Sequence, residues 1–147
     1  MKEAQVYLLF NGDCGAAMAH YGKALGAQVE MQTFDQAPIP DEFKAKGKII
    51  HARLQRGPTV IMASDCRPND PVQVGNNFSV SLQCESREEV DRLMKALGEG
   101  GKVLMPPADT FWNAYFGMLT DRFGVSWMLN HEKPKAAVAP GALEGGG

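Results

Sequence analysis

The same order of secondary structure elements is predicted twice along this chain, and that repeat limits the fold more than any other feature. The tetrapeptide Lys-Ala-Leu-Gly closes a helical pattern at residues 23–26 and again at residues 95–98. In each half a strand pattern precedes the helix and three strand patterns follow it, the last two as a hairpin. Two βαβββ modules are therefore predicted, in an α+β fold whose mixed sheets together form a cup.

The predicted elements follow from apolar residues spaced for strands or for helices. Strands are predicted at residues 5–11, 28–33, 48–54, 59–64, 78–84 and 102–105, and helices at residues 14–25 and 87–97. Ser86 and Glu89 form a capping box at the start of the second helix, while Gly26 and Gly98 end the two helices. We expect a single domain over residues 1–131, with modules at about 5–65 and 77–131, a connector at 66–76 and a disordered tail at 132–147.

The final hairpin carries most of the aromatic character of the chain. Residues 110–130 hold six of the twelve aromatic side chains, and the sequence Asp121-Arg122-Phe123-Gly124 predicts the turn. A lone βαβββ module leaves one face of its sheet bare, so two modules can enclose a pocket. The aromatic residues then either fill the core or form a pocket wall or a dimer contact.

Four sequence segments resemble the PhnB-like branch of the vicinal oxygen chelate superfamily, which includes glyoxalase I, ring-cleaving dioxygenases and fosfomycin- and bleomycin-resistance proteins. The segments are His51–Leu54, Val60–Asp65, Thr110–Trp112 and Phe116–Val125, and the resemblance extends over about Gln5 to Asn130. It implies paired βαβββ modules and a concave pocket for a small organic ligand.

The same resemblance identifies where a catalytic metal would bind, because metal enzymes of that superfamily place His and Glu on four strands of the concave face. Alignment puts those positions near Val6, Met62, Asn77 and Met128, which are poor ligands for zinc, manganese or iron(II). We therefore expect no metal at that position and no cofactor. The glycine-rich segment 98–102 follows a helix instead of opening one, which argues against a methyltransferase with a nucleotide-like cofactor.

His51 is the main candidate for chemistry. If the hairpin turns at Arg56-Gly57, His51 faces Met62 on the concave face, and imidazole can exchange a proton near neutral pH. Strand alternation turns Phe78, Val80 and Leu82 toward the helix and the intervening residues toward the cavity. The candidate site is therefore His51 as acid or base, with ligand contacts at Asn77, Ser79, Ser81, Trp112 and Tyr115. The alternatives are a hydrogen-bonded structural histidine, serines that face water, and aromatic residues that pack in the core.

Composition excludes several partners. A net charge of −2 and a pI near 5.9 argue against binding to nucleic acid or to an acidic membrane surface. The apolar run Val6–Phe10 is too short for a signal peptide or a membrane span. Three cysteines without paired spacing indicate reduced, packed thiols and a cytoplasmic protein. The long segment Thr33–Gly47 is predicted to be a lid or a dimer element.

Two classes of function remain open at this stage. The missing metal ligands favour a protein that binds or sequesters a small molecule. The alternative is a lyase or isomerase that uses His51 as acid or base, or a metal held by unusual ligands such as His51 with Asp65. A regulatory role is a more distant third.

We expect the chain to form a homodimer, because the aromatic hairpin offers more apolar surface than one 147-residue domain readily covers. Light scattering at micromolar concentration should give twice the mass of one chain. A mass near 16.0 kDa would contradict this expectation.

Overall fold

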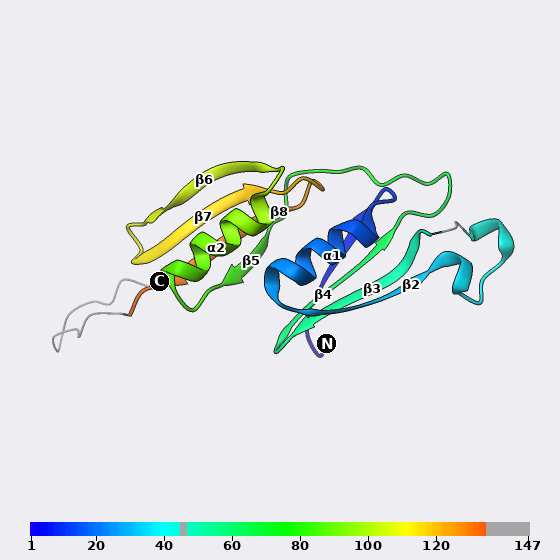
Figure 1. Cartoon of the computed structure of the whole chain (residues 1–147), viewed down its shortest axis with the longest axis horizontal. Coiled ribbons are helices and arrows are strands. Elements are labelled where there is room, and N and C mark those ends of the chain that lie inside the picture. Colours follow the sequence, from blue (N-terminus) through cyan, green and yellow to red (C-terminus); the bar gives the residue numbers. More distant parts are fainter. Residues whose placement is uncertain (45–46, 135–147) are drawn as a thin grey trace. The chain divides into compact units, whose positions relative to one another are not determined.

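The computed structural model describes residues 1–44 and 47–134, which form two compact units, the first ending at Gly75 and the second beginning at Asn76 (Figure 1). Each unit contains one α-helix and one four-stranded sheet. No helix among the described residues is long and apolar enough to cross a membrane. The predicted α+β fold with two βαβββ modules is confirmed.

The first unit runs through β1 (Val6–Phe10), α1 (Cys14–Leu25), β2 (Gln28–Thr33), the 3-10 turns η1 (Phe34–Gln36) and η2 (Asp41–Phe43), β3 (Ile49–Arg56) and β4 (Thr59–Asp65). Its strands lie in the order β1-β4-β3-β2. β1 is parallel to β4, and the other neighbours are antiparallel. The helix packs against β2, β3 and β4 and so covers one face of the sheet.

The second unit repeats this arrangement with β5 (Val80–Gln83), α2 (Arg87–Gly98), β6 (Lys102–Asp109), β7 (Ala114–Thr120) and β8 (Ser126–Glu132). The strand order β5-β8-β7-β6 corresponds position by position to that of the first unit, again with one parallel pair. Ser86 caps α2 by accepting a hydrogen bond from the Glu89 amide at 3.0 Å, as the capping box predicts.

Each unit has its own core between the helix and one face of the sheet. In the first unit Met18, Tyr21, Leu54 and Ile61 are at most 1% exposed, and in the second the equivalent layer holds Val90, Leu97, Leu119, Trp127 and Leu129. Because side chains alternate along a strand, the residues between these core positions point to the opposite face. Within each unit no described helix packs on that opposite face, which we call the helix-free face.

Among the described residues each unit holds one buried aspartate, and the two lie at different places in the repeat. The carboxylate of Asp65 accepts hydrogen bonds from the amides of Gly12 and Cys14 at 2.9 Å each and from the Ile49 amide at 2.8 Å. It therefore joins the end of β4 to the start of α1 and to β3. Asp121 accepts from the Phe123 and Val125 amides and from the Trp127 indole nitrogen at 2.8 Å, which fixes the predicted turn from Asp121 to Gly124.

The register of the first hairpin differs from the prediction. Arg56 pairs with Thr59 and Arg53 with Met62, so the two turn residues are Gly57 and Pro58. His51 does not face Met62, and the prediction is wrong by two residues. Because the side-chain period of a strand is two, the shift leaves His51 and Met62 on the same face.

Other boundaries also move. β5 begins only at Val80, so Phe78 is 83% exposed instead of facing the helix. α2 includes Gly98 instead of ending before it. Glu132 closes β8 and the Lys133 amide donates to the Asn113 carbonyl at 3.0 Å, so ordered structure continues into the predicted tail. Residues 135–147 of that tail lie outside the described residues.

Replacing Asp65 with alanine should lower the free energy of unfolding by about 2–4 kcal/mol, because buried amides would lose their acceptor. Urea unfolding followed by far-UV circular dichroism measures this change. Asp70→Ala is the matched control, since Asp70 is exposed and its carboxylate makes no hydrogen bond or ion pair within the described residues. Equal unfolding midpoints for the two variants would show that Asp65 does not hold the unit together.

Candidate functional site

The helix-free face of the first sheet carries a mixture of polar, aromatic and charged side chains. The pairing of Tyr7 with Met62, of Arg53 with Met62 and of His51 with Gln32 places all of these side chains on one face. The face as a whole presents Tyr7, Leu9, Glu30, Gln32, His51, Arg53, Met62 and Ser64. Such a mixture suits a small organic molecule that has both apolar and hydrogen-bonding groups.

A hydrogen bond between Tyr7 and His51 lies at the centre of this face. The Tyr7 hydroxyl is 3.1 Å from His51 Nδ1, and the ring centroids are 5.8 Å apart. Both side chains are exposed, and Tyr7 is 45% exposed. The contact orients the imidazole, whose Nε2 has no hydrogen bond to any described residue and is available to a ligand as donor or acceptor. The sequence pointed to His51 but did not identify Tyr7 as its partner.

The positions expected for a metal do not offer suitable donors. The structure corrects two of them: Val6 pairs with Ile61 on the helix side, and Asn77 lies before β5. The pairs on the helix-free faces that include the other two expected positions are Tyr7 with Met62 in the first unit and Ser81 with Met128 in the second. Neither pair includes the imidazole or carboxylate that zinc or iron(II) requires, so these residues do not fit such a metal.

The alternative metal pair of His51 with Asp65 is not supported by the geometry. Asp65 points to the helix side, where three backbone amides occupy its carboxylate, whereas His51 lies on the opposite face. Among the described residues no group of three or more His, Cys, Asp or Glu side chains could hold a metal ion.

In the second unit the candidate residues are only partly brought together. Ser81 is on the helix-free face, where Gln83 Nε2 donates to its hydroxyl at 3.1 Å and Asn130 Nδ2 donates to Gln83 Oε1 at 2.9 Å. Asn77 and Ser79 are exposed and precede the strand. Asn130 was missed by the sequence reasoning, although alternation from Met128 would have placed it on this face.

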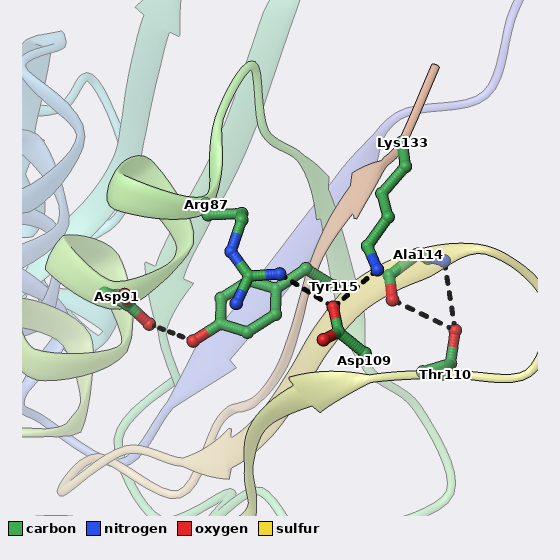
Figure 2. A network of polar contacts seen from close by, with 7 residues as sticks. All are labelled: Arg87, Asp91, Asp109, Thr110, Ala114, Tyr115 and Lys133. Atoms are coloured by element: carbon green, nitrogen blue, oxygen red, sulfur yellow. Dashed lines mark hydrogen bonds and ion pairs between the residues drawn. The ribbon is translucent and has the colours of Figure 1, made fainter. Parts of the chain in front are cut away.

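Tyr115 belongs to a different cluster, on the helix side of its sheet (Figure 2). Its hydroxyl donates to Asp91 of α2 at 2.6 Å, and the Arg87 guanidinium lies 4.1 Å from the ring centroid. Asp109 accepts from Arg87 at 2.7 Å and from Lys133 at 2.6 Å. Tyr115 therefore does not share a face with Ser81, because the alternation along β7 turns it toward α2.

The charges in this cluster explain two pKa shifts. The hydrogen bond to the Asp91 carboxylate raises the pKa of Tyr115, while the hydrogen bonds from Lys133 and Arg87 lower the pKa of Asp109. Figure 2 also shows the Thr110 hydroxyl bonded to both backbone groups of Ala114, which closes the loop before β7. The cluster thus fixes the start of α2 to β6 and β7.

Trp112 lies in the loop between β6 and β7 and remains 44% exposed. Its ring makes edge contacts with Phe111 at 4.9 Å and with Phe116 at 5.8 Å between centroids. Phe111 itself is 96% exposed. The rings of Phe111 and Trp112 are therefore part of the apolar surface and do not pack in the core of the second unit.

A cavity of about 430 Å³ lies in the first unit at the end of β4. It is lined by Phe34, Ile39, Pro40, Ile50, Ser64, Asp65 and Arg67. The first three come from the segment that the sequence predicted as a lid or a dimer element. The cavity itself was not predicted, because it depends on how that segment folds back over the strands.

The thiols of Cys14 and Cys84 are buried, in agreement with their predicted packing role. Burial raises the pKa of Cys14 to about 12 and the pKa of Cys84 to about 11. Both side chains therefore stay neutral at physiological pH and are poor nucleophiles. Neither contributes to a reactive site.

Comparison with known proteins agrees with this geometry. The family model described as Glyoxalase/Bleomycin resistance protein/Dioxygenase superfamily matches residues 4–129. Protein YjdN of Escherichia coli K12 is 33% identical, over 84% of this chain and 91% of its own length. The structure of protein PA1353 from Pseudomonas aeruginosa has 45% identity and a TM-score of 0.79, with 88% and 98% of the two chains covered.

A second similar structure is that of the Bacillus cereus PhnB protein, described as a putative 3-demethylubiquinone-9 3-methyltransferase. It has 27% identity and a TM-score of 0.68, with 88% and 99% of the two chains covered. Together these matches confirm the resemblance found in the sequence.

Proposed function

Because the chain belongs to the glyoxalase/bleomycin resistance protein/dioxygenase superfamily, we propose that it binds a small polar or aromatic organic molecule on the helix-free face of its first sheet. The observation that carries this proposal is the exposed Tyr7–His51 hydrogen bond of 3.1 Å. A phenol ring offers a flat surface for stacking, and the oriented imidazole offers a hydrogen bond. Gln32, Arg53 and Ser64 supply further polar contacts on the same face.

For the second unit, taken by itself, we propose Asn77, Ser79, Ser81 and Trp112 as ligand contacts. All four side chains are accessible, and Ser81 is linked to Gln83 and Asn130 by hydrogen bonds. Tyr115 is removed from this set, because α2 engages both its hydroxyl and its ring.

A homodimer in the cytoplasm is part of the same proposal. Exposed apolar side chains on β6 and in the following loop support self-association, among them Val103, Leu104, Met105 and Phe111. The three cysteines are unpaired, which is typical of a reducing compartment.

A second candidate function is that of a lyase or isomerase with His51 as acid or base. The observation in its favour is again the hydrogen bond between Tyr7 and His51 Nδ1, since a base is more effective when a neighbour fixes its orientation. His51 would take up a proton from the substrate at Nε2 or deliver one there. The residues at the metal positions do not fit a metal, so no step of this reaction is assigned to one.

Methyl transfer is not proposed. The glycine-rich segment from Gly98 to Lys102 connects α2 to β6, so its amides do not gather at a helix N-terminus. Gly101 has a packing role, because a Cβ there would clash with the Thr120 carbonyl oxygen.

Replacing His51 with alanine should weaken ligand binding by about 1–3 kcal/mol, the cost of a lost hydrogen bond, while the protein stays folded. Native mass spectrometry of protein purified without dialysis identifies a retained ligand, and ligand-observed NMR with a panel of aromatic and polar fragments supplies probes otherwise. Isothermal titration calorimetry then compares the parent with His51→Ala.

Lys23→Ala is the control for this experiment, since Lys23 is an exposed residue of α1, which packs on the other face of the sheet, and the change should leave affinity unchanged. Tyr7→Phe keeps the ring and removes only the hydroxyl, so it should reduce affinity less than the His51 change. If His51→Ala binds as tightly as the parent, His51 is structural and the proposed site is wrong.

A further inference from the structure

We propose that the cavity at the end of β4 binds the apolar body of an organic anion whose acidic group pairs with Arg67. This inference rests on the proposed function and deepens it, because it assigns a chemical class to the ligand. The cavity volume of about 430 Å³ falls within the roughly 300–1,000 Å³ typical of small-molecule sites.

The apolar wall of the cavity is built by a bulge and a folded segment. The register between β2 and β3 shifts at Gln32/Thr33, where Ile49 and His51 have partners and Ile50 is the extra residue. Such bulges redirect a side chain and are frequent beside binding sites. Here the extra residue Ile50 contributes to the cavity lining.

Backbone hydrogen bonds hold the segment that covers this wall. The Phe34 amide donates to the Lys48 carbonyl at 2.9 Å, the Ala37 amide to the Phe34 carbonyl at 3.2 Å, and the Ile39 amide to the Ala37 carbonyl at 2.9 Å. Phe34 is only 4% exposed. Phe34, Ile39 and Ile50 therefore present an apolar surface that is already formed before a ligand binds.

The charges at the cavity favour an anion over a cation. Asp65 is 4% exposed, and three backbone amides bind its carboxylate, so its charge is already compensated within the fold. Arg67 is exposed and its guanidinium has no hydrogen bond or ion pair to any described residue. Arginine is well suited to a planar acidic group because its donors can bind two oxygens at once.

One lining residue of the cavity, Ser64, connects it to the strand that carries His51. Ala52 pairs with Ala63, and one further step of that antiparallel register brings His51 opposite Ser64. Ser64 belongs to the cavity lining. A ligand that contacts Ser64 in the cavity is therefore one strand away from the imidazole.

Two fluorescent probes that differ in one group test this assignment. 8-Anilinonaphthalene-1-sulfonate is an aromatic anion, and N-phenyl-1-naphthylamine is the same ring system without the sulfonate. Fluorescence titrations at pH 7.5 are performed on the parent, Arg67→Gln and Ile39→Ser. Lys23→Gln is the control for the loss of one positive charge from the first unit, since Lys23 is an exposed residue of α1 outside the cavity lining.

Arg67→Gln should weaken binding of the sulfonate about three- to tenfold, as expected for one partly exposed ionic contact. It should leave the affinity for the neutral probe within about twofold. Ile39→Ser should weaken both probes, because both share the apolar body. Lys23→Gln should match the parent.

The inference is overturned if Arg67→Gln binds the sulfonate as tightly as the parent, or if Ile39→Ser leaves both probes unaffected. It is also overturned if Arg67→Gln weakens both probes equally, since the arginine would then act through packing alone. These outcomes are separable from the His51 test. If His51→Ala weakens binding of the retained ligand and Arg67→Gln does not affect probe binding, the proposed function stands without the anion site. If probe binding depends on Arg67 and His51→Ala has no effect, the anion site stands and His51 is structural.

Discussion

A four-stranded sheet with one helix can bury only one of its two faces, and both units of this chain are built under that constraint. The helix side takes the large apolar residues, including Tyr21 and Leu54 in the first unit and Trp127 in the second, all at 0% exposure. The other face receives the alternate residues of the same strands. The fold thus separates residues that stabilise the protein from residues that are free to bind a ligand.

The buried carboxylates show how closely stability and the candidate site are connected. Asp65 stands at the end of β4 and binds amides of Gly12, Cys14 and Ile49, so it positions the strands whose neighbouring residues, Ser64 and Ile50, line the cavity. The same hydrogen bonds compensate the negative charge of Asp65, which would otherwise attract a metal or repel an anion. In the second unit the buried carboxylate of Asp121 lies at a different place, where it accepts hydrogen bonds within the β7–β8 turn and from the Trp127 indole.

The order and type of the elements could be predicted because each depends on local spacing. α1 and β2 begin and end at the predicted residues. Gly124, at the end of the predicted turn, has a φ angle of 91°, which glycine readily adopts. The predicted register of the first hairpin was wrong by two residues. Gly57 and Pro58 form its turn, and composition does not distinguish this turn from one at Arg56-Gly57. Because side chains alternate with a period of two, a shift of two residues left His51 on the predicted face but changed its pairing partner.

Much of the candidate site lay beyond sequence reasoning because it depends on contacts between distant residues. The Tyr7–His51 bond joins positions 44 residues apart, and the cavity needs the bulge at Ile50 together with the loop that carries Ile39. Tyr115 was placed in the pocket because of its aromatic character, while its contacts with Arg87 and Asp91 become visible only when α2 packs on β7. The main candidate site therefore lies on the first sheet and not on the aromatic hairpin.

The most direct test of this account is a backbone and side-chain NMR titration with the ligand retained by the protein, or with the best fragment found by screening. The account predicts the largest chemical shift changes at Tyr7, His51 and Ser64, on the helix-free face of the first sheet, with little change at core residues of α1 such as Met18. Shift changes concentrated on the exposed Phe111 and Trp112 loop, with Tyr7 and His51 unchanged, would contradict it.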